Sequence, residues 1–75
     1  MTWEELKEEA KKMGYELQRD YLDYLSKCFG KDLSLTFQEY GDVCIDAMTD
    51  FCNINITFTE HRTPDQMFAI MKALQ

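Results

Sequence analysis

The sequence lacks most of the residue patterns that identify a catalytic or metal-binding protein. Its three cysteines (Cys28, Cys44 and Cys52) are irregularly spaced and form no C-x-x-C pair, so they predict neither a disulfide scaffold nor a structural zinc site. We expect Cys28 and Cys52 to be buried as small hydrophobic residues and Cys44 to lie on a polar face. The one histidine, His61, has no serine or cysteine motif to serve, which predicts a surface or capping role.

Long apolar segments are also missing. No run approaches the roughly 20 apolar residues of a membrane span, and the start "MTWEELKEEAKK" lacks the apolar core of a secretion signal. We therefore expect a cytoplasmic protein with reduced cysteines and no membrane partner. The 75 residues, 45% of them hydrophobic, predict one domain over residues 1–75 with a core near the lower size limit for independent stability.

Basic residues are absent from the middle of the chain. Residues 32–61 hold six acidic residues and no lysine or arginine, whereas the segments on either side are nearly neutral. The net charge of −6 therefore arises in this segment. Because binding to a phosphate backbone needs clustered lysine and arginine, we expect no direct contact with nucleic acid.

The two ends of the chain carry helix signals. A capping-box pattern and apolar spacings of three and four predict a helix over residues 3–13. Near the other end, Thr63, Pro64 and Gln66 provide an N-cap, a first-turn proline and a second capping box for a closing helix. Residues 16–29 fit a further helix with a wide apolar arc, although tyrosine-rich runs of this kind also form strands.

Three segments between these helices alternate apolar and polar residues with the period of a β-strand. They cover residues 33–38, 42–47 and 52–59, joined by a tight turn at Gly41 and a looser turn near Asp50. The fold class predicted is α+β, with two N-terminal helices, a three-stranded antiparallel meander and a C-terminal helix. We expect the helices to pack on one face of the sheet. The residues of the last strand predicted to point into the core are Cys52, Ile54, Ile56 and Phe58.

The opposite face of this sheet gathers polar and acidic residues, which are the candidates for binding a partner. Asp42 and Asp46 would share that face about 13 Å apart, at roughly 3.3 Å per residue, which is too far for a pair of catalytic carboxylates. The pattern favours a solvated or partner-binding face over a catalytic or metal site, and it implies no cofactor. The candidate residues are Glu39, Asp42, Cys44, Asp46, Asp50, Asn53 and Asn55.

Two resemblances to known proteins add context. The order helix, three strands, helix resembles the topology of double-stranded RNA-binding domains, but "TPDQ" at residues 63–66 stands where those domains carry a basic cluster, so RNA binding is not implied. The stretches "WEELKEEAKKMGY" and "RTPDQMFAIMKAL" resemble small uncharacterised proteins of bacterial, phage and prophage genomes. That resemblance implies a cytoplasmic protein that acts by binding, in a setting where inhibitors of host defence, including anti-CRISPR proteins, are common.

Three functions follow, in order of support. The first is a small acidic, non-enzymatic protein-binding module, of the kind that inhibits a host nucleic-acid-binding protein. The second is a structural or regulatory homo-oligomer, suggested by the apolar arc of residues 17–29 and the small core. The third is a small metal-dependent enzyme that would use Glu39, Asp46, Asp50 or His61 with a divalent cation.

Overall fold

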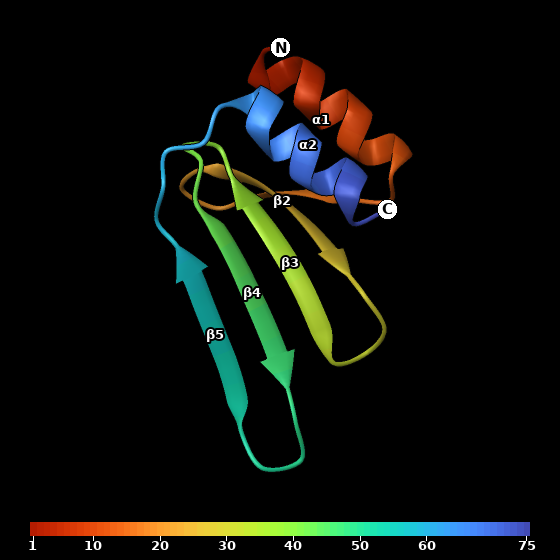
Figure 1. Ribbon diagram of the computed structural model, residues 1–75, viewed down its shortest axis with the longest axis vertical. Coiled ribbons are helices and arrows are strands. Elements are labelled where there is room, and N and C mark those ends of the chain that lie inside the picture. Colours follow the sequence, from red (N-terminus) through yellow and green to blue (C-terminus); the bar gives the residue numbers. More distant parts are fainter.

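The computed structural model describes residues 1–75 and shows two helices beside a five-stranded antiparallel sheet (Figure 1). The strands follow one another in chain order across the sheet, from β1 at one edge to β5 at the other. The α+β class is confirmed, but the predicted three-stranded meander is wrong, because two further strands precede it. The elements are α1 (Trp3–Lys12), β1 (Glu16–Arg19), β2 (Asp23–Cys28), β3 (Leu33–Gln38), β4 (Val43–Met48), β5 (Asn53–Phe58) and α2 (Pro64–Ala73).

The extra strands replace the second helix expected over residues 16–29. In the β1–β2 hairpin, Leu17 pairs with Leu25 and both face the helices, while Tyr21 and Leu22 lie in the exposed turn. The apolar arc therefore does not exist as one surface. Tyr24, which has the strand preference of aromatic residues, lies in β2.

Both remaining helices begin where the sequence predicts. The Thr2 hydroxyl accepts the Glu5 backbone N–H at 3.1 Å, and the Glu5 carboxylate accepts the Thr2 backbone N–H at 3.0 Å. Thr63 and Gln66 form the same reciprocal pair at the start of α2, at 3.2 and 2.9 Å. Each pair satisfies two backbone donors that a helix start leaves free. Neither helix has the length and apolar character needed to cross a membrane.

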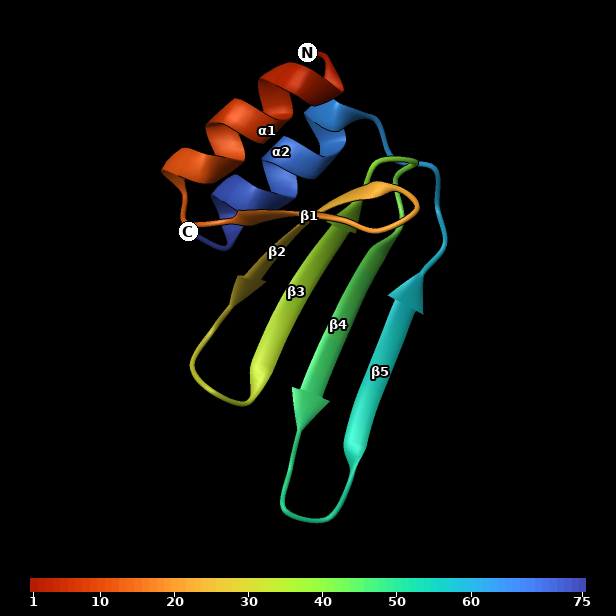
Figure 2. The same ribbon diagram turned by 180° about the vertical axis from the view of Figure 1, so that it is seen from behind.

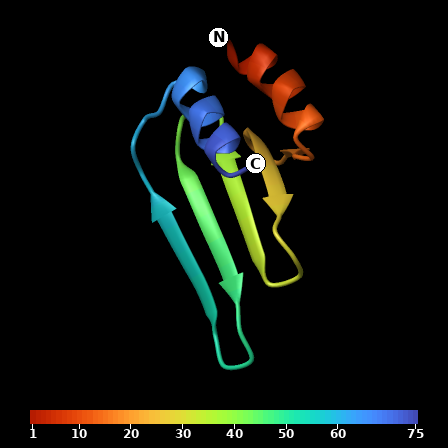
Figure 3. The ribbon, with the colours of Figure 1, turned by 45° about the vertical axis from the view of Figure 1, so that its right-hand side comes forward.

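The two helices lie side by side on one face of the sheet, over one end of it (Figures 1 and 3). Side chains that are almost fully buried fill the space between the helices and strands β2, β3 and β4, and Tyr15 packs edge-on against Phe37. The far ends of the longer strands extend beyond this core, so the molecule measures 40 Å along its longest axis against 24 and 23 Å across. The core residues are Leu6, Ala10, Tyr15, Leu25, Leu35, Phe37, Val43, Met67 and Met71.

The β3–β4 turn is fixed against the segment that leads from β5 into α2. Gly41 occupies this turn with φ +106°, and a Cβ built there would lie 2.7 Å from the Arg62 carbonyl oxygen. The Arg62 guanidinium also donates to the carbonyl oxygens of Gly41 and Phe58, both at 3.3 Å. This contact carries the chain from the edge strand back over the sheet, which places α2 against α1 (Figure 2).

Candidate protein-binding surface

Strand β5 is the most exposed regular element of the protein. All six of its residues are exposed, and its three large apolar side chains keep close to half of their surface open: 44% for Ile54, 46% for Ile56 and 45% for Phe58. The prediction that these residues and Cys52 point into a core is therefore wrong. Ile54, Ile56 and Phe58 lie on the side of the sheet that carries the helices, because they pair with Ala47, Ile45 and Val43. The helices do not extend over β5 (Figure 3).

The register of the sheet shows that these side chains continue the core outward. Ile54, Ile56 and Phe58 pair directly with Ala47, Ile45 and Val43, and paired residues of antiparallel strands lie on the same face. Beside them, Leu33 on β3 is 41% exposed, and Leu74 at the end of α2 is 49% exposed. We call the uncovered part of this face the bare apolar face. Its residues are Leu33, Ile45, Ala47, Ile54, Ile56 and Phe58.

The size of this surface is within the range of functional surface patches. The bare apolar face exposes on the order of 400 Å² of apolar surface, comparable to the largest patch on a typical monomer, which is often functional. It is also hollowed: a cavity of about 250 Å³ opens between Phe29, Leu35, Ile45 and Leu74. The exposed apolar surface therefore includes a hollow at the end of α2 as well as the exposed side chains of β5.

The outer edge of β5 also leaves backbone groups unpaired. The Thr49 N–H donates to the Cys52 carbonyl at 2.9 Å, and hydrogen-bonded pairs alternate along an antiparallel ladder. Ile54, Ile56 and Phe58 therefore direct their N–H and C=O groups toward β4. Asn53, which precedes them, and Asn55 and Thr57, which lie between them, direct their N–H and C=O groups away from the sheet.

Natural proteins usually protect such an edge. Charged side chains, proline, bulges or a covering helix prevent an edge strand from pairing with another chain. The opposite edge, β1, is only four residues long and carries Glu16 and Arg19. The β5 sequence "NINITF" has no charge, no proline and no bulge, and each of its residues pairs one-to-one with β4. It is open to pairing with another strand.

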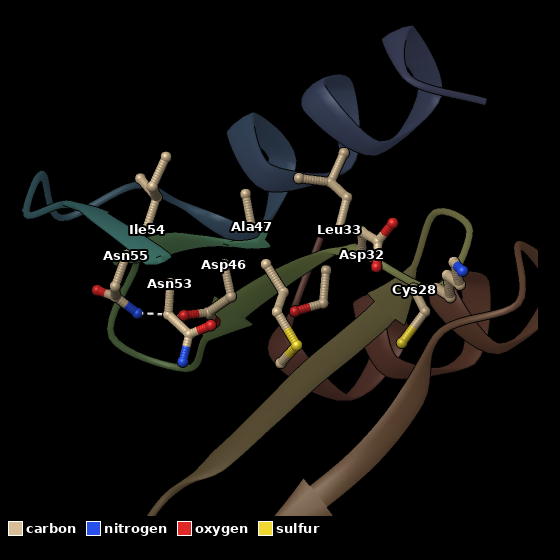
Figure 4. A pocket seen from close by; sticks show the side chains of 11 residues that line it. Cys28, Asp32, Leu33, Asp46, Ala47, Asn53, Ile54 and Asn55 are labelled. Atoms are coloured by element: carbon tan, nitrogen blue, oxygen red, sulfur yellow. Dashed lines mark hydrogen bonds between the residues drawn. The ribbon is translucent and has the colours of Figure 1, made fainter. Parts of the chain in front are cut away.

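Three of the predicted candidate residues meet on the opposite, polar face. Asp46, Asn53 and Asn55 point away from the helices, whereas Leu33, Ala47 and Ile54 point toward them (Figure 4). The Asn55 side-chain amide donates to the Asp46 carboxylate. These residues border a hollow of about 360 Å³, which Lys31, Asp32 and Cys28 close at the β2–β3 turn.

The other acidic candidates lie elsewhere. Glu39 and Asp42 are in the β3–β4 turn, where Asp42 is buried, and Asp50 is exposed in the β4–β5 turn at the opposite end of the sheet. The acidic residues of the 32–61 segment therefore form no single cluster. Cys44 lies between the two ends, half-buried, with its thiol 3.6 Å from the Gln38 amide nitrogen and 3.5 Å from the Thr57 hydroxyl.

The remaining cysteines differ from expectation. Cys28 ends β2 instead of lying on a helix, Cys52 precedes β5, and both are exposed, so their prediction as buried hydrophobic residues is wrong. Both lie at strand ends that extend beyond the helices and the core. The alternating pattern that assigned Cys52 to the inner face could not show that this end of the face is uncovered.

The titratable groups do not assemble into a reactive centre. His61 is exposed, with Nδ1 3.3 Å from the Tyr40 carbonyl oxygen. Partial burial, with Asp42 and Cys44 nearby, raises the pKa of the Tyr40 hydroxyl above its ordinary value. No three histidine, cysteine, aspartate or glutamate side chains lie close enough together to hold a metal ion. The surface with the most distinctive features is thus the bare apolar face and the β5 edge.

Comparison with known proteins returns no match among family models, curated proteins or solved structures. Reasoning from the sequence placed the candidate surface on the polar face and missed the apolar one. The signal for it was present in "NINITF", an alternating strand with no charge to protect it.

Proposed function

We propose that the protein is a non-enzymatic protein-binding module, and that its partner binds at the bare apolar face and the free edge of β5. The observation that carries this proposal is that all of β5 is exposed while its apolar residues lie in register with the core. Leaving apolar side chains in water forgoes about 25 cal/mol per Å² of possible burial. An uncharged edge strand adds unpaired backbone groups that another strand can satisfy.

The acidity of residues 32–61 supports a narrower proposal about the partner. Two exposed aspartates lie next to β5, Asp46 opposite Asn55 on β4 and Asp50 in the β4–β5 turn. Residues 32–61 contain no lysine or arginine. A basic partner, such as a nucleic-acid-binding protein that this chain would inhibit, suits that charge. The resemblance of the chain ends to phage and prophage proteins adds the setting of such an inhibitor.

The salt dependence of binding distinguishes the contribution of the aspartates from that of the bare apolar face. Attraction between exposed charges is screened over about 8 Å at physiological ionic strength and over about 3 Å at 1 M, whereas apolar contact is not weakened by salt. A partner held mainly by Asp46 and Asp50 is released at high salt. A partner held by the bare apolar face remains bound.

The experiment compares proteins captured from cell lysate by tagged wild type and by two matched double variants of β5. Ile54→Ser with Ile56→Ser removes two apolar side chains from the bare apolar face. Asn55→Ser with Thr57→Ser changes the same strand on its polar face. We expect a partner that survives high salt, is lost with the first variant and is kept with the second. Equal capture by all three proteins would contradict the proposal.

A further inference from the structure

We infer that, when no other protein occupies it, the free edge of β5 pairs strand to strand with a second copy of this chain across a two-fold axis. This inference rests on the proposed function, because it uses the same edge. The edge is compatible with itself: it has no charge, and its outward backbone groups come from Asn53, Asn55 and Thr57. Two such edges running antiparallel satisfy one another's N–H and C=O groups.

The alternation of backbone groups restricts the register. Outward-facing residues must meet outward-facing residues, so a symmetric pair is centred either on Asn55 or on an inward residue such as Ile56. Centring on Ile56 sets Ile56 against Ile56 of the second copy and Ile54 against Phe58, all on the apolar face. Asn55 then pairs with Thr57 on the polar face.

Apolar contact favours the register centred on Ile56. Within β5, this register sets all three apolar side chains of one copy against those of the other, Ile56 against Ile56 and Ile54 against Phe58. Centring on Asn55 pairs Ile54 with Ile56 and leaves Phe58 beyond the end of the other copy's strand. We therefore assign the pairing centred on Ile56.

This arrangement also places the helices of each copy beside the bare apolar face of the other. A two-fold axis perpendicular to the sheet keeps the helices of both copies on the same side and reverses the strand direction. In one copy, the helices lie over one end of the sheet and leave the other end uncovered (Figure 1). The two-fold axis therefore places the helical end of each copy next to the uncovered end of the other. The bare apolar faces join into one strip across the centre of a continuous sheet, bordered by helices on both sides.

The buried area predicts a weak, reversible dimer. Two paired six-residue edges, with their side chains, bury on the order of 1,000 Å² in total, at the lower limit of specific interfaces. Each copy also carries a net charge of −6, so the copies repel one another at long range. Because salt screens this repulsion and leaves apolar contact intact, the dimer should strengthen as salt rises. A complex with a basic partner would show the opposite trend.

Sedimentation equilibrium over a range of concentrations, at low and high salt, tests the inference. We expect twice the chain mass at high concentration and tighter association at high salt. Asn55→Pro removes an outward N–H without touching the β4 ladder, and proline is tolerated on the solvent side of an edge strand. With two backbone hydrogen bonds lost per dimer, the dissociation constant should rise by at least about 30-fold. Asn55→Ala keeps the N–H and should remain dimeric.

A cysteine scan checks the register without depending on the proline variant. In a background with the three native cysteines changed to serine, Ile56→Cys should form a disulfide-linked dimer under mild oxidation, because Ile56 faces its own copy in a close, non-hydrogen-bonded pair. Ile54→Cys and Asn55→Cys should stay unlinked. Linkage through Asn55→Cys, or no linkage in any variant, would overturn the assigned pairing.

The outcomes separate this inference from the proposed function. A wild-type protein that stays monomeric at high concentration and salt overturns self-pairing. So does a dimer that Asn55→Pro leaves intact. If the Ile54→Ser, Ile56→Ser variant nevertheless loses a captured protein, the binding module stands and only the self-pairing is wrong. If β5 variants change neither self-association nor capture, both proposals fail together.

Discussion

Replacing Gly41 with alanine tests the contact that returns the chain from β5 to the helices. Gly41 has φ +106°, and a Cβ built there would lie 2.7 Å from the Arg62 carbonyl oxygen and 2.8 Å from the His61 carbonyl carbon. These are backbone atoms, which cannot rotate away as the end of a side chain can. Gly30 provides a matched control, because its φ is also positive, +76°, but a Cβ placed on it would meet nothing within 4 Å.

The expected losses of stability differ because only one glycine is sterically confined. A non-glycine residue in this backbone region costs about 1–2 kcal/mol, so Gly30→Ala should lose about 1 kcal/mol. Gly41→Ala adds a displacement of the 61–62 backbone, which would disturb the hydrogen bonds from Arg62 to the Gly41 and Phe58 carbonyl oxygens. Its total loss should reach at least about 3 kcal/mol, since each lost hydrogen bond contributes about 1 kcal/mol.

Urea denaturation followed by circular dichroism measures both changes. A domain of 75 residues has roughly 4–11 kcal/mol of stability, so a loss of about 3 kcal/mol is a large fraction of the total and easily resolved. Equal losses for Gly41→Ala and Gly30→Ala would refute the reasoning. They would mean that backbone strain alone accounts for the effect and that the 61–62 segment does not press on the turn.

Three further predictions concern the core, the edge strand and the first helix cap. Tyr15→Phe should stabilise the protein by about 1 kcal/mol in thermal denaturation, because the Tyr15 hydroxyl is buried without a hydrogen-bond partner; a loss would contradict this. Leu25→Ala should lower the free energy of unfolding by about 2–5 kcal/mol in a urea titration of dilute protein. Ile54→Ala, at a 44% exposed position, should lower it by about 1 kcal/mol or less. Similar losses for the two variants would show that the Ile54 side chain is buried in solution. Hydrogen bonding to the Thr2 backbone lowers the pKa of Glu5 below its ordinary value of 4.5, so Glu5 stabilises the fold above pH 4.5 and this contribution is lost as the pH falls further. Glu5→Gln should remove that part of the acid sensitivity between pH 7 and pH 3, and an unchanged pH profile would be the contrary result.

Local chemistry explains which elements could be predicted from the sequence. The starts of α1 and α2 depend on capping residues within four positions of each other, so their signal is complete in the sequence. Residues 16–29 carry no such local signal. Their apolar spacings fit a helix, and the face of β2 that carries Leu25 also carries Asp23 and Lys27, so no apolar–polar alternation marks the strand. Pairing with β3, through contacts such as Leu25 with Phe37, decides for the strand.

The candidate surface shows a different limit. Alternation in "NINITF" correctly places Ile54 and Ile56 on the helix side of the sheet, because the side-chain period of a strand is two. Whether that side is covered depends on where α2 ends, which is set by packing over residues distant in sequence. Alternation likewise correctly places Asp46, Asn53 and Asn55 together on the polar face. Their distance from Glu39 and Asp42 is determined by the turns, which alternation does not describe.

The lengths of the elements explain why part of the sheet stays bare. Each ten-residue helix is about 15 Å long and about 10 Å wide, so the two together cover roughly 300 Å² of sheet. Five strands at about 4.8 Å spacing, most of them about 20 Å long, present close to 500 Å² on that face. Two helices of this length cannot cover it in any orientation. The uncovered part includes β5 because both helices are held away from this edge strand. The chain connects α1 to β1 at the opposite edge of the sheet, and the Gly41–Arg62 contact holds the start of α2 near the β3–β4 turn. A second copy paired along β5 adds no third helix to either chain, yet it places the existing helices of each beside the uncovered end of the other.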